Sequence, residues 1–115
     1  MTVVDERLAP DQVKELFRLD AKTGKVYFRE RGREWFEADQ PCKTWNTRFA
    51  GKETFTFFDK RKGEYTGNIF GQGTRRAMIV YCLAHGIWPP HRVGFHDGDK
   101  KNTRPENIYL KEPRR

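Results

Sequence analysis

The sequence contains no apolar run that approaches the roughly 18 residues of a membrane-spanning helix. Its first residues also lack the basic segment followed by an apolar segment that is typical of a signal peptide. Cysteine is scarce, since Cys42 and Cys82 are the two in the chain and they stand far apart. Two isolated cysteines indicate neither a disulfide framework nor a thiolate zinc site. These absences argue against a membrane protein and predict a cytoplasmic protein with reduced thiols.

Two further kinds of site are not indicated by the motifs. His85, His91 and His96 lie near one another in the sequence, but no cysteine or acidic residue accompanies them at zinc spacing. The stretch Gly71-Gln72-Gly73 has no lysine at the spacing of a phosphate-binding loop and does not fit the dinucleotide fingerprint. We therefore expect neither a histidine zinc site nor a nucleotide-binding loop.

Positive charge and aromatic side chains are plentiful. Lys and Arg number 23 against 16 Asp and Glu, which gives a formal net charge of +7 and a pI near 9.6. Such a surface favours a polyanionic partner, although a basic surface that serves solubility alone would have the same composition. Nine Phe, four Tyr and three Trp can fill much of the core of a 115-residue chain. This length is typical of one domain, which we expect to span residues 1–115.

Hydrophobic spacing predicts an α+β fold, in which a helix and a small antiparallel sheet precede a second helix capped by Thr74. Residues 1–9 are expected to form a loose arm. Residues 29–40 are charged and irregular, and they predict a loop that Trp35 and Phe36 anchor to the core. The predicted helices cover residues 10–19 and 75–85, and the predicted strands cover residues 25–28, 54–58 and 64–70, with turns at 20–24 and 59–63 and a break at 71–73.

The last fifth of the chain, residues 91–110, predicts a hairpin that runs into a short helix. Val93 and Phe95 favour a strand, and Asp97-Gly98-Asp99 has the composition of a turn whose glycine can take positive φ. Pro105 suits the first turn of the helix that follows. Unpaired N–H groups at a helix N-terminus, with basic side chains beside them, are a favourable place for a phosphate.

The motif HDGDKKNTRPENIYL in this segment resembles the ββα-metal core of small phage-type HNH endonucleases. FRLDAKTGKVYF near the N-terminus and YCLAHGIWPP before the hairpin are similar to phrases of the same family, so the resemblance covers about residues 16–110. It implies an HNH-like ββα motif at residues 91–110, a phage or prophage origin and DNA as the partner. It also implies one divalent cation, Mg²⁺ or a similar ion, if the nuclease site is active.

The resemblance does not extend to the residues that carry the family's chemistry. The family's metal-binding aspartate falls on Gly94 and its general-base histidine on Phe95, while its middle asparagine falls on Thr103. Asn107 matches the asparagine of the family's helix. Cleavage needs a base to deprotonate water and a divalent cation to stabilise the leaving oxygen, and neither Gly94 nor Phe95 can supply either.

The first functional hypothesis is an HNH-endonuclease-like DNA-binding protein whose nuclease site is lost or weakened. Basic side chains would contact the phosphate backbone, and recognition would depend mainly on backbone and shape. These contacts are predicted for Arg75, Arg76, Arg92, Lys100, Lys101 and Arg104.

Two alternatives remain open. In an active metal-dependent DNA endonuclease, His96 would act as the base, and Asp97 and Asn107 would hold the metal. Because a one-residue shift turns a strand side chain to the opposite face, this alternative requires a bulge or a tighter turn. The other alternative is a protein-binding inhibitor or regulator built on the same frame, with residues 29–46 as its interaction surface.

Overall fold

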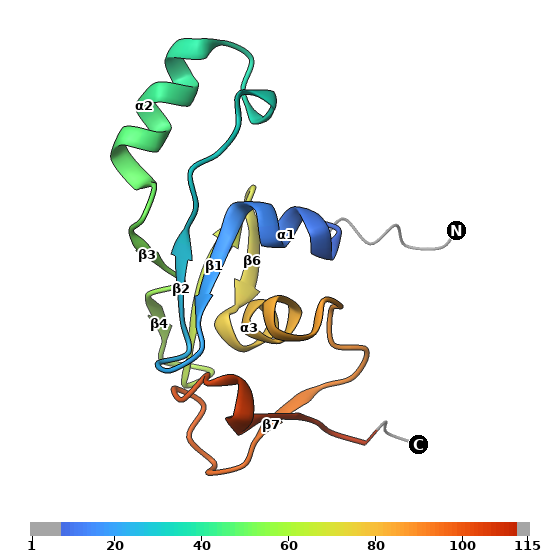
Figure 1. The fold of residues 1–115 in the computed structure, drawn as a ribbon. Coiled ribbons are helices and arrows are strands. Elements are labelled where there is room, and N and C mark those ends of the chain that lie inside the picture. Colours follow the sequence, from blue (N-terminus) through green and yellow to red (C-terminus); the bar gives the residue numbers. More distant parts are fainter. Residues whose placement is uncertain (1–7, 113–115) are drawn as a thin grey trace, which may run out of the picture.

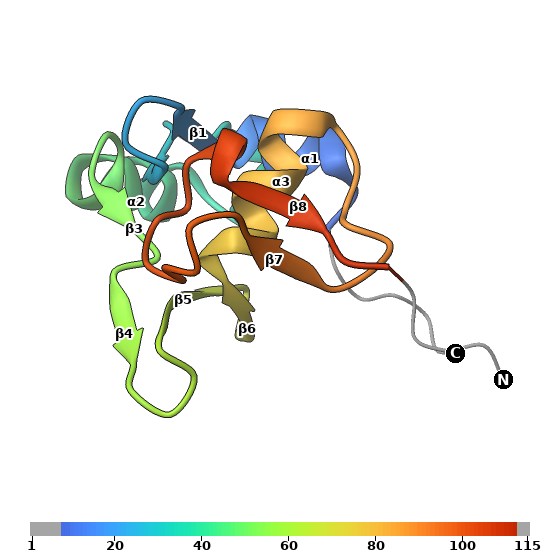
Figure 2. The same ribbon diagram turned by 90° about the horizontal axis from the view of Figure 1, so that it is seen from below.

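Helices and small antiparallel sheets alternate along the chain in the computed structural model, which describes residues 8–112 (Figures 1 and 2). The predicted α+β class is confirmed. Of the predicted loose arm, residues 1–7 lie outside the described residues. Leu8 packs against the core, and its carbonyl accepts a hydrogen bond of 2.7 Å from the indole N–H of Trp88. Ala9 is the N-cap of the first helix, so the prediction of a loose arm is wrong for these two residues.

The N-terminal part of the chain builds the first sheet. Its elements are α1 (Pro10–Leu16), β1 (Phe17–Asp20), β2 (Lys25–Phe28) and β3 (Glu53–Thr54), with the strands in the order β1-β2-β3. The helix predicted over residues 10–19 therefore ends at Leu16. Phe17 is extended because it pairs with Phe28, and its side chain is buried. Strand pairing overrides the helical spacing at this point.

The second sheet consists of β4 (Phe57–Asp59), β5 (Glu64–Ile69) and β6 (Gln72–Arg75), in that order. The strand predicted over residues 54–58 is broken at Phe55, which has a left-handed backbone conformation with φ of 59°. The ring of Phe55 enters the core and is 1% exposed, and it rests on Gly67, where a Cβ would lie 2.7 Å from the ring. Burial of this aromatic ring offsets the unfavourable backbone conformation and separates β3 from β4.

A tight turn joins β5 to β6, where the sequence predicts only a break. Phe70 and Gly71 have φ values of 47° and 83°, as two-residue hairpin turns require. β6 runs directly into α3 (Arg76–His85), so the N-cap of this helix is Arg75 and not the predicted Thr74. The helix ends as predicted at Gly86, which has φ of 77°.

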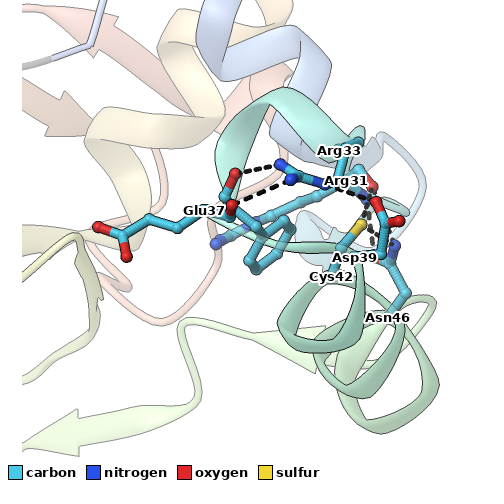
Figure 3. Close-up of polar contacts among 7 residues, drawn as sticks. Arg31, Arg33, Glu37, Asp39, Cys42 and Asn46 are labelled. Carbon is cyan, nitrogen blue, oxygen red and sulfur yellow. Dashed lines mark hydrogen bonds and ion pairs between the residues drawn. The ribbon is translucent and has the colours of Figure 1, made fainter.

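A helix begins at the end of the segment predicted as a loop, residues 29–40, and continues beyond it. After the 3-10 helix η1 (Arg33–Trp35), α2 (Asp39–Phe49) forms an arm that projects from the rest of the molecule (Figure 1). None of its residues is buried. Asn46 ties the arm to the preceding loop, because its side chain donates to the carbonyl of Arg31 (2.9 Å) and accepts from the N–H of Arg31 (2.8 Å) (Figure 3). The guanidinium of Arg33 adds an ion pair of 2.6 Å with Asp39.

The two predicted aromatic anchors have different roles. Trp35 packs against the core and stacks on Phe70 with ring centroids 5.7 Å apart. Phe36 contacts Trp45 of α2 instead, with ring centroids 6.3 Å apart. The anchoring prediction is therefore confirmed for Trp35, whereas Phe36 belongs to the arm.

The third sheet pairs β7 (Val93–Phe95) with β8 (Ile108–Leu110), and its order of elements differs from the predicted one. The second strand follows the single-turn 3-10 helix η2 (Pro105–Asn107) instead of preceding it. Residues 99–104 form no strand, because the N–H groups of Asp99 and Lys101 donate to the side chains of Asp97 and Asp99. The predicted hairpin and helix are thus a strand, a loop, a helical turn and a strand.

α3 lies at the centre of the core and packs on α1, β1 and β5 (Figures 1 and 2). The core residues are Val13, Leu16, Phe17, Val26, Phe55, Ile69, Ala77, Ile79, Val80, Cys82 and Ile108. Among residues 8–112, no helix is long and apolar enough to cross a membrane.

Candidate functional site

The loop between β7 and η2 is organised around the side chain of Asp97. Its carboxylate accepts hydrogen bonds from the N–H of Asp99 (2.8 Å) and from the amides of Asn102 (2.8 Å) and Asn107 (2.9 Å). Asn107 is buried; its amide also donates to the carbonyl of Asn102 (2.8 Å), and its side-chain oxygen accepts from the N–H of Asp97 (3.1 Å). The structure therefore brings together the two predicted metal ligands, Asp97 and Asn107, and both are engaged in holding the loop.

Acidification should loosen this loop through Asp97. The amide of Asn102, the N–H of Asp99 and the amide of Asn107 lower the pKa of Asp97 from its ordinary value of 3.8. A depressed carboxyl pKa stabilises the folded loop above pH 3.8, and this stabilisation is lost as the pH falls through the folded-state pKa. The side-chain amide NMR signals of Asn102 and Asn107 should therefore titrate with a midpoint below pH 3.8. A midpoint at or above that value would contradict the role given to these hydrogen bonds.

His96, the predicted base, lies on the surface beside a second aromatic ring. Its backbone N–H donates to the carbonyl of Asn107 at 2.9 Å, and its imidazole packs against the ring of Tyr109 with centroids 4.6 Å apart. Within residues 8–112, no group of three or more His, Cys, Asp or Glu side chains is gathered at metal-binding distance. The contact that the structure gives the imidazole of His96 is therefore with the ring of Tyr109.

Tyr109 also occupies the space that a side chain at position 94 would need. Gly94 and Tyr109 are partners across β7 and β8, and the phenol end of Tyr109 covers the buried Gly94. A Cβ on Gly94 would lie 2.6 Å from Cζ of Tyr109. The neighbouring Phe95 packs against the hydrophobic core. Positions 94 and 95 are therefore filled by aromatic packing, and a carboxylate at position 94 would require Tyr109 to move.

A hollow of about 430 Å³ opens over Gly94 and Tyr109, and we name it the basic groove. Its lining comes from β7, β8 and the residues next to them, from β5 and β6, from the β4–β5 turn and from the loop that follows β7. The cationic side chains that line it are Lys62, Arg75, Arg92, Lys100 and Lys111. Glu64 is the acidic residue of the lining, and it is buried and paired with Arg75 at 3.6 Å. The groove therefore carries a strong excess of positive charge.

The six predicted DNA contacts separate into three groups. Arg75, Arg92 and Lys100 line the basic groove. Lys101 and Arg104 are exposed but lie outside its lining. Arg76 is buried with 5% of its surface exposed. The burial of Arg76 does not fit its predicted contact with phosphate.

Arg76 instead connects α3 to the loop. Its guanidinium donates to the hydroxyl of Thr103 (2.8 Å) and to the carbonyl of Lys101 (2.9 Å), and it faces the ring of Tyr65 at 4.2 Å. The Thr103 hydroxyl donates in turn to the carbonyl of Gly24 at 2.8 Å. Burial lowers the pKa of Arg76, and the charge of Glu53 opposes that shift. This buried chain of contacts fixes the loop that carries Lys100.

Sequence reasoning missed Lys62, Tyr109 and Lys111 as residues of the groove. Lys62 belongs to the basic β4–β5 turn, whose composition is equally that of an ordinary solvated turn, and its carbonyl accepts a hydrogen bond of 3.2 Å from the Lys100 ammonium. Lys111 follows β8, and its N–H donates to the carbonyl of Arg92 at 2.7 Å. No spacing in the sequence indicates these pairs, because tertiary folding brings the β4–β5 turn to the loop.

A second hollow, of about 470 Å³, lies along the α2 arm. Its apolar lining comes mainly from Phe36, Pro41, Trp45 and Phe49. The guanidinium of Arg31 lies 3.9 Å from the ring centroid of Trp45, and burial lowers its pKa. This contact stabilises the arm, and the hollow differs from the basic groove in having little charge.

Comparison of the chain with family models, curated proteins and solved structures gives no match. The basic groove is therefore interpreted from its own residues. Five cations surround a glycine and a tyrosine in this groove, and positions 94 and 95 carry no ionisable group that could act as a base.

Proposed function

We propose that this protein binds nucleic acid through the basic groove, on a frame like that of small phage HNH endonucleases, with its nuclease site lost. The observation that carries the proposal is the convergence of five cationic side chains on one hollow whose acidic residue is already paired. An anionic backbone with regularly spaced phosphates is the partner that matches such a surface. Recognition would rest on phosphate contacts and shape, since the groove offers few neutral hydrogen-bonding side chains.

The same residues support the loss of cleavage. An HNH-type site needs a base and a metal ligand side by side, and these positions are taken by Phe95 and by Gly94 beneath Tyr109. Asp97 already accepts three hydrogen bonds, and the side chain of Asn107 is engaged on both its oxygen and its nitrogen. Binding metal through this pair would require these bonds to break and the loop to rearrange.

Binding to nucleic acid should weaken steeply as salt is raised. Each phosphate neutralised contributes about −0.9 to the slope of log K against log salt for duplex DNA, or about −0.7 for a single strand. Three to five contacts from the groove therefore predict a slope between roughly −2 and −4.5. Fluorescence anisotropy with a labelled oligonucleotide between about 50 and 200 mM salt would measure this slope. An affinity that is independent of salt would overturn the proposal.

A nicking assay on supercoiled plasmid with Mg²⁺, Mn²⁺ or EDTA tests the alternative of an active endonuclease. We expect no metal-dependent nicking by the wild-type protein. Nicking that is lost in both His96→Ala and Asn107→Ala, with binding retained, would instead show that a shifted catalytic site is active. His96→Ala should destabilise the fold less than Asn107→Ala, because His96 is exposed and Asn107 is buried.

A further inference from the structure

An exposed aromatic pair distinguishes the basic groove from a merely cationic surface. Tyr109 lines the groove and is 39% exposed, and the imidazole of His96 packs against its ring, with 33° between the ring planes. Base faces are hidden in a duplex, whereas unpaired bases can stack on aromatic side chains. We propose that the groove takes single-stranded nucleic acid, with one unpaired base stacked on Tyr109 and His96. This inference rests on the proposed function and specifies its substrate class.

The ring of Tyr109 is held in place by its neighbours, as a stacking surface requires. Tyr109 stands in β8 between the buried Ile108 and the half-buried Leu110, and its phenol end rests on Gly94. The main chain of His96 is fixed by the hydrogen bond of its backbone N–H to the carbonyl of Asn107, and its imidazole packs against the ring of Tyr109. Since any side chain at position 94 would displace Tyr109, glycine there leaves room for the ring beside the strand. Little conformational entropy remains to be lost when a base stacks on it.

The cations of the groove are arranged on both sides of Tyr109 along the strands. Arg92 and Lys111 stand at one end of the β7–β8 ladder, joined by the bond between the Lys111 N–H and the Arg92 carbonyl. Lys100 and Lys62 stand beyond the other end, joined by the bond between the Lys100 ammonium and the Lys62 carbonyl. A strand lying along the ladder would therefore place a phosphate on each side of the stacked base. Cations that follow the backbone and an aromatic surface between them are the combination used to bind single strands.

The test compares four ligands of one sequence, about 12 nucleotides long: single-stranded DNA, single-stranded RNA, the DNA duplex, and a single strand with 2-aminopurine at its centre. We expect the single strand to bind at least about tenfold more tightly than the duplex. Tyr109→Ala should weaken single-strand binding roughly five- to hundredfold and abolish the stacking-dependent quenching of 2-aminopurine, with duplex binding changed less than about twofold. A preference for single-stranded DNA or for single-stranded RNA would identify which of the two nucleic acids binds, and either preference supports the inference.

Two further variants control this experiment. Tyr109→Phe keeps the ring on Gly94 and should retain binding and quenching, so that a loss in Tyr109→Ala is not attributed to misfolding. Phe57→Ala removes an aromatic ring that is 69% exposed and lies outside the groove, and it should have no effect. Equal affinity for single strand and duplex, with no effect of Tyr109→Ala, would overturn the inference and leave the proposed function standing. Absence of salt-sensitive binding to all four ligands would overturn both.

Discussion

Replacing Arg92, Lys100 and Lys111 together by alanine should weaken nucleic-acid binding about a hundredfold or more at low salt. These three side chains line the groove at both ends of the β7–β8 ladder, and none of them belongs to the buried network that fixes the loop. A hydrogen bond to a charged group contributes about 1.5 kcal/mol or more, which is about tenfold in affinity, and screening reduces the sum for exposed contacts. The salt slope should also become shallower by about 2 to 3 units.

A matched variant separates the groove from net charge. Lys22, Lys43 and Lys52 are exposed and lie outside the groove, so replacing all three by alanine changes the net charge equally. We expect this control to lower affinity less than about fivefold, because isolated charges act at long range and are screened. Circular dichroism and thermal unfolding should show both variants folded, since all six side chains are at least partly exposed. Equal losses in the two variants would mean that the charge of the whole protein, and not the groove, governs binding.

The parts of the fold that the sequence predicts are those set by local chemistry. Val13 and Leu16 follow helical spacing and are buried, Gly86 ends α3 with positive φ, and Gly98 has φ of 75° in the predicted turn. The pairing of Asp97 with Asn107 was also predictable, as two polar residues of one motif. In the structure both side chains hold the loop, which folds around the carboxylate of Asp97, and their role as metal ligands stays a prediction.

The parts that the sequence does not predict depend on contacts between distant segments. α2 carries Trp45 and Phe49 at helical spacing, but none of its residues is buried, and the helix is held by the loop before it. Arg76 follows Arg75 in the sequence, yet one is buried against Thr103 and the other faces the groove. Neighbouring residues at the start of a helix point in different directions, and composition alone cannot say which of the two meets solvent.

Gly24→Ala should be strongly destabilising, because the turn between β1 and β2 supports the loop of the groove. Gly24 has φ of 75°, and a Cβ there would lie 2.5 Å from the backbone nitrogen of Arg104 and 2.7 Å from the carbonyl oxygen of Thr103. Left-handed backbone costs about 1–2 kcal/mol for a residue with a side chain, and forcing atoms into packed space adds about 1–3 kcal/mol. We expect a total of about 3–4 kcal/mol and a melting temperature lower by about 10 °C or more in thermal unfolding.

The chain contains a matched control in the turn between β4 and β5. Gly63 has φ of 69° and its N–H donates to the Asp59 carbonyl at 2.7 Å, as that of Gly24 does to Asp20, but no atom lies within 4 Å of its Cβ position. Gly63→Ala should therefore cost only the backbone part, about 1–2 kcal/mol. The amide NMR signals of residues 96–104 should shift in Gly24→Ala and stay in place in Gly63→Ala, because Thr103 bonds to Gly24 and Arg76 bonds to Thr103. Equal destabilisation by the two substitutions would mean that the loop yields freely, and that the contact between Gly24 and Thr103 does not fix the wall of the basic groove.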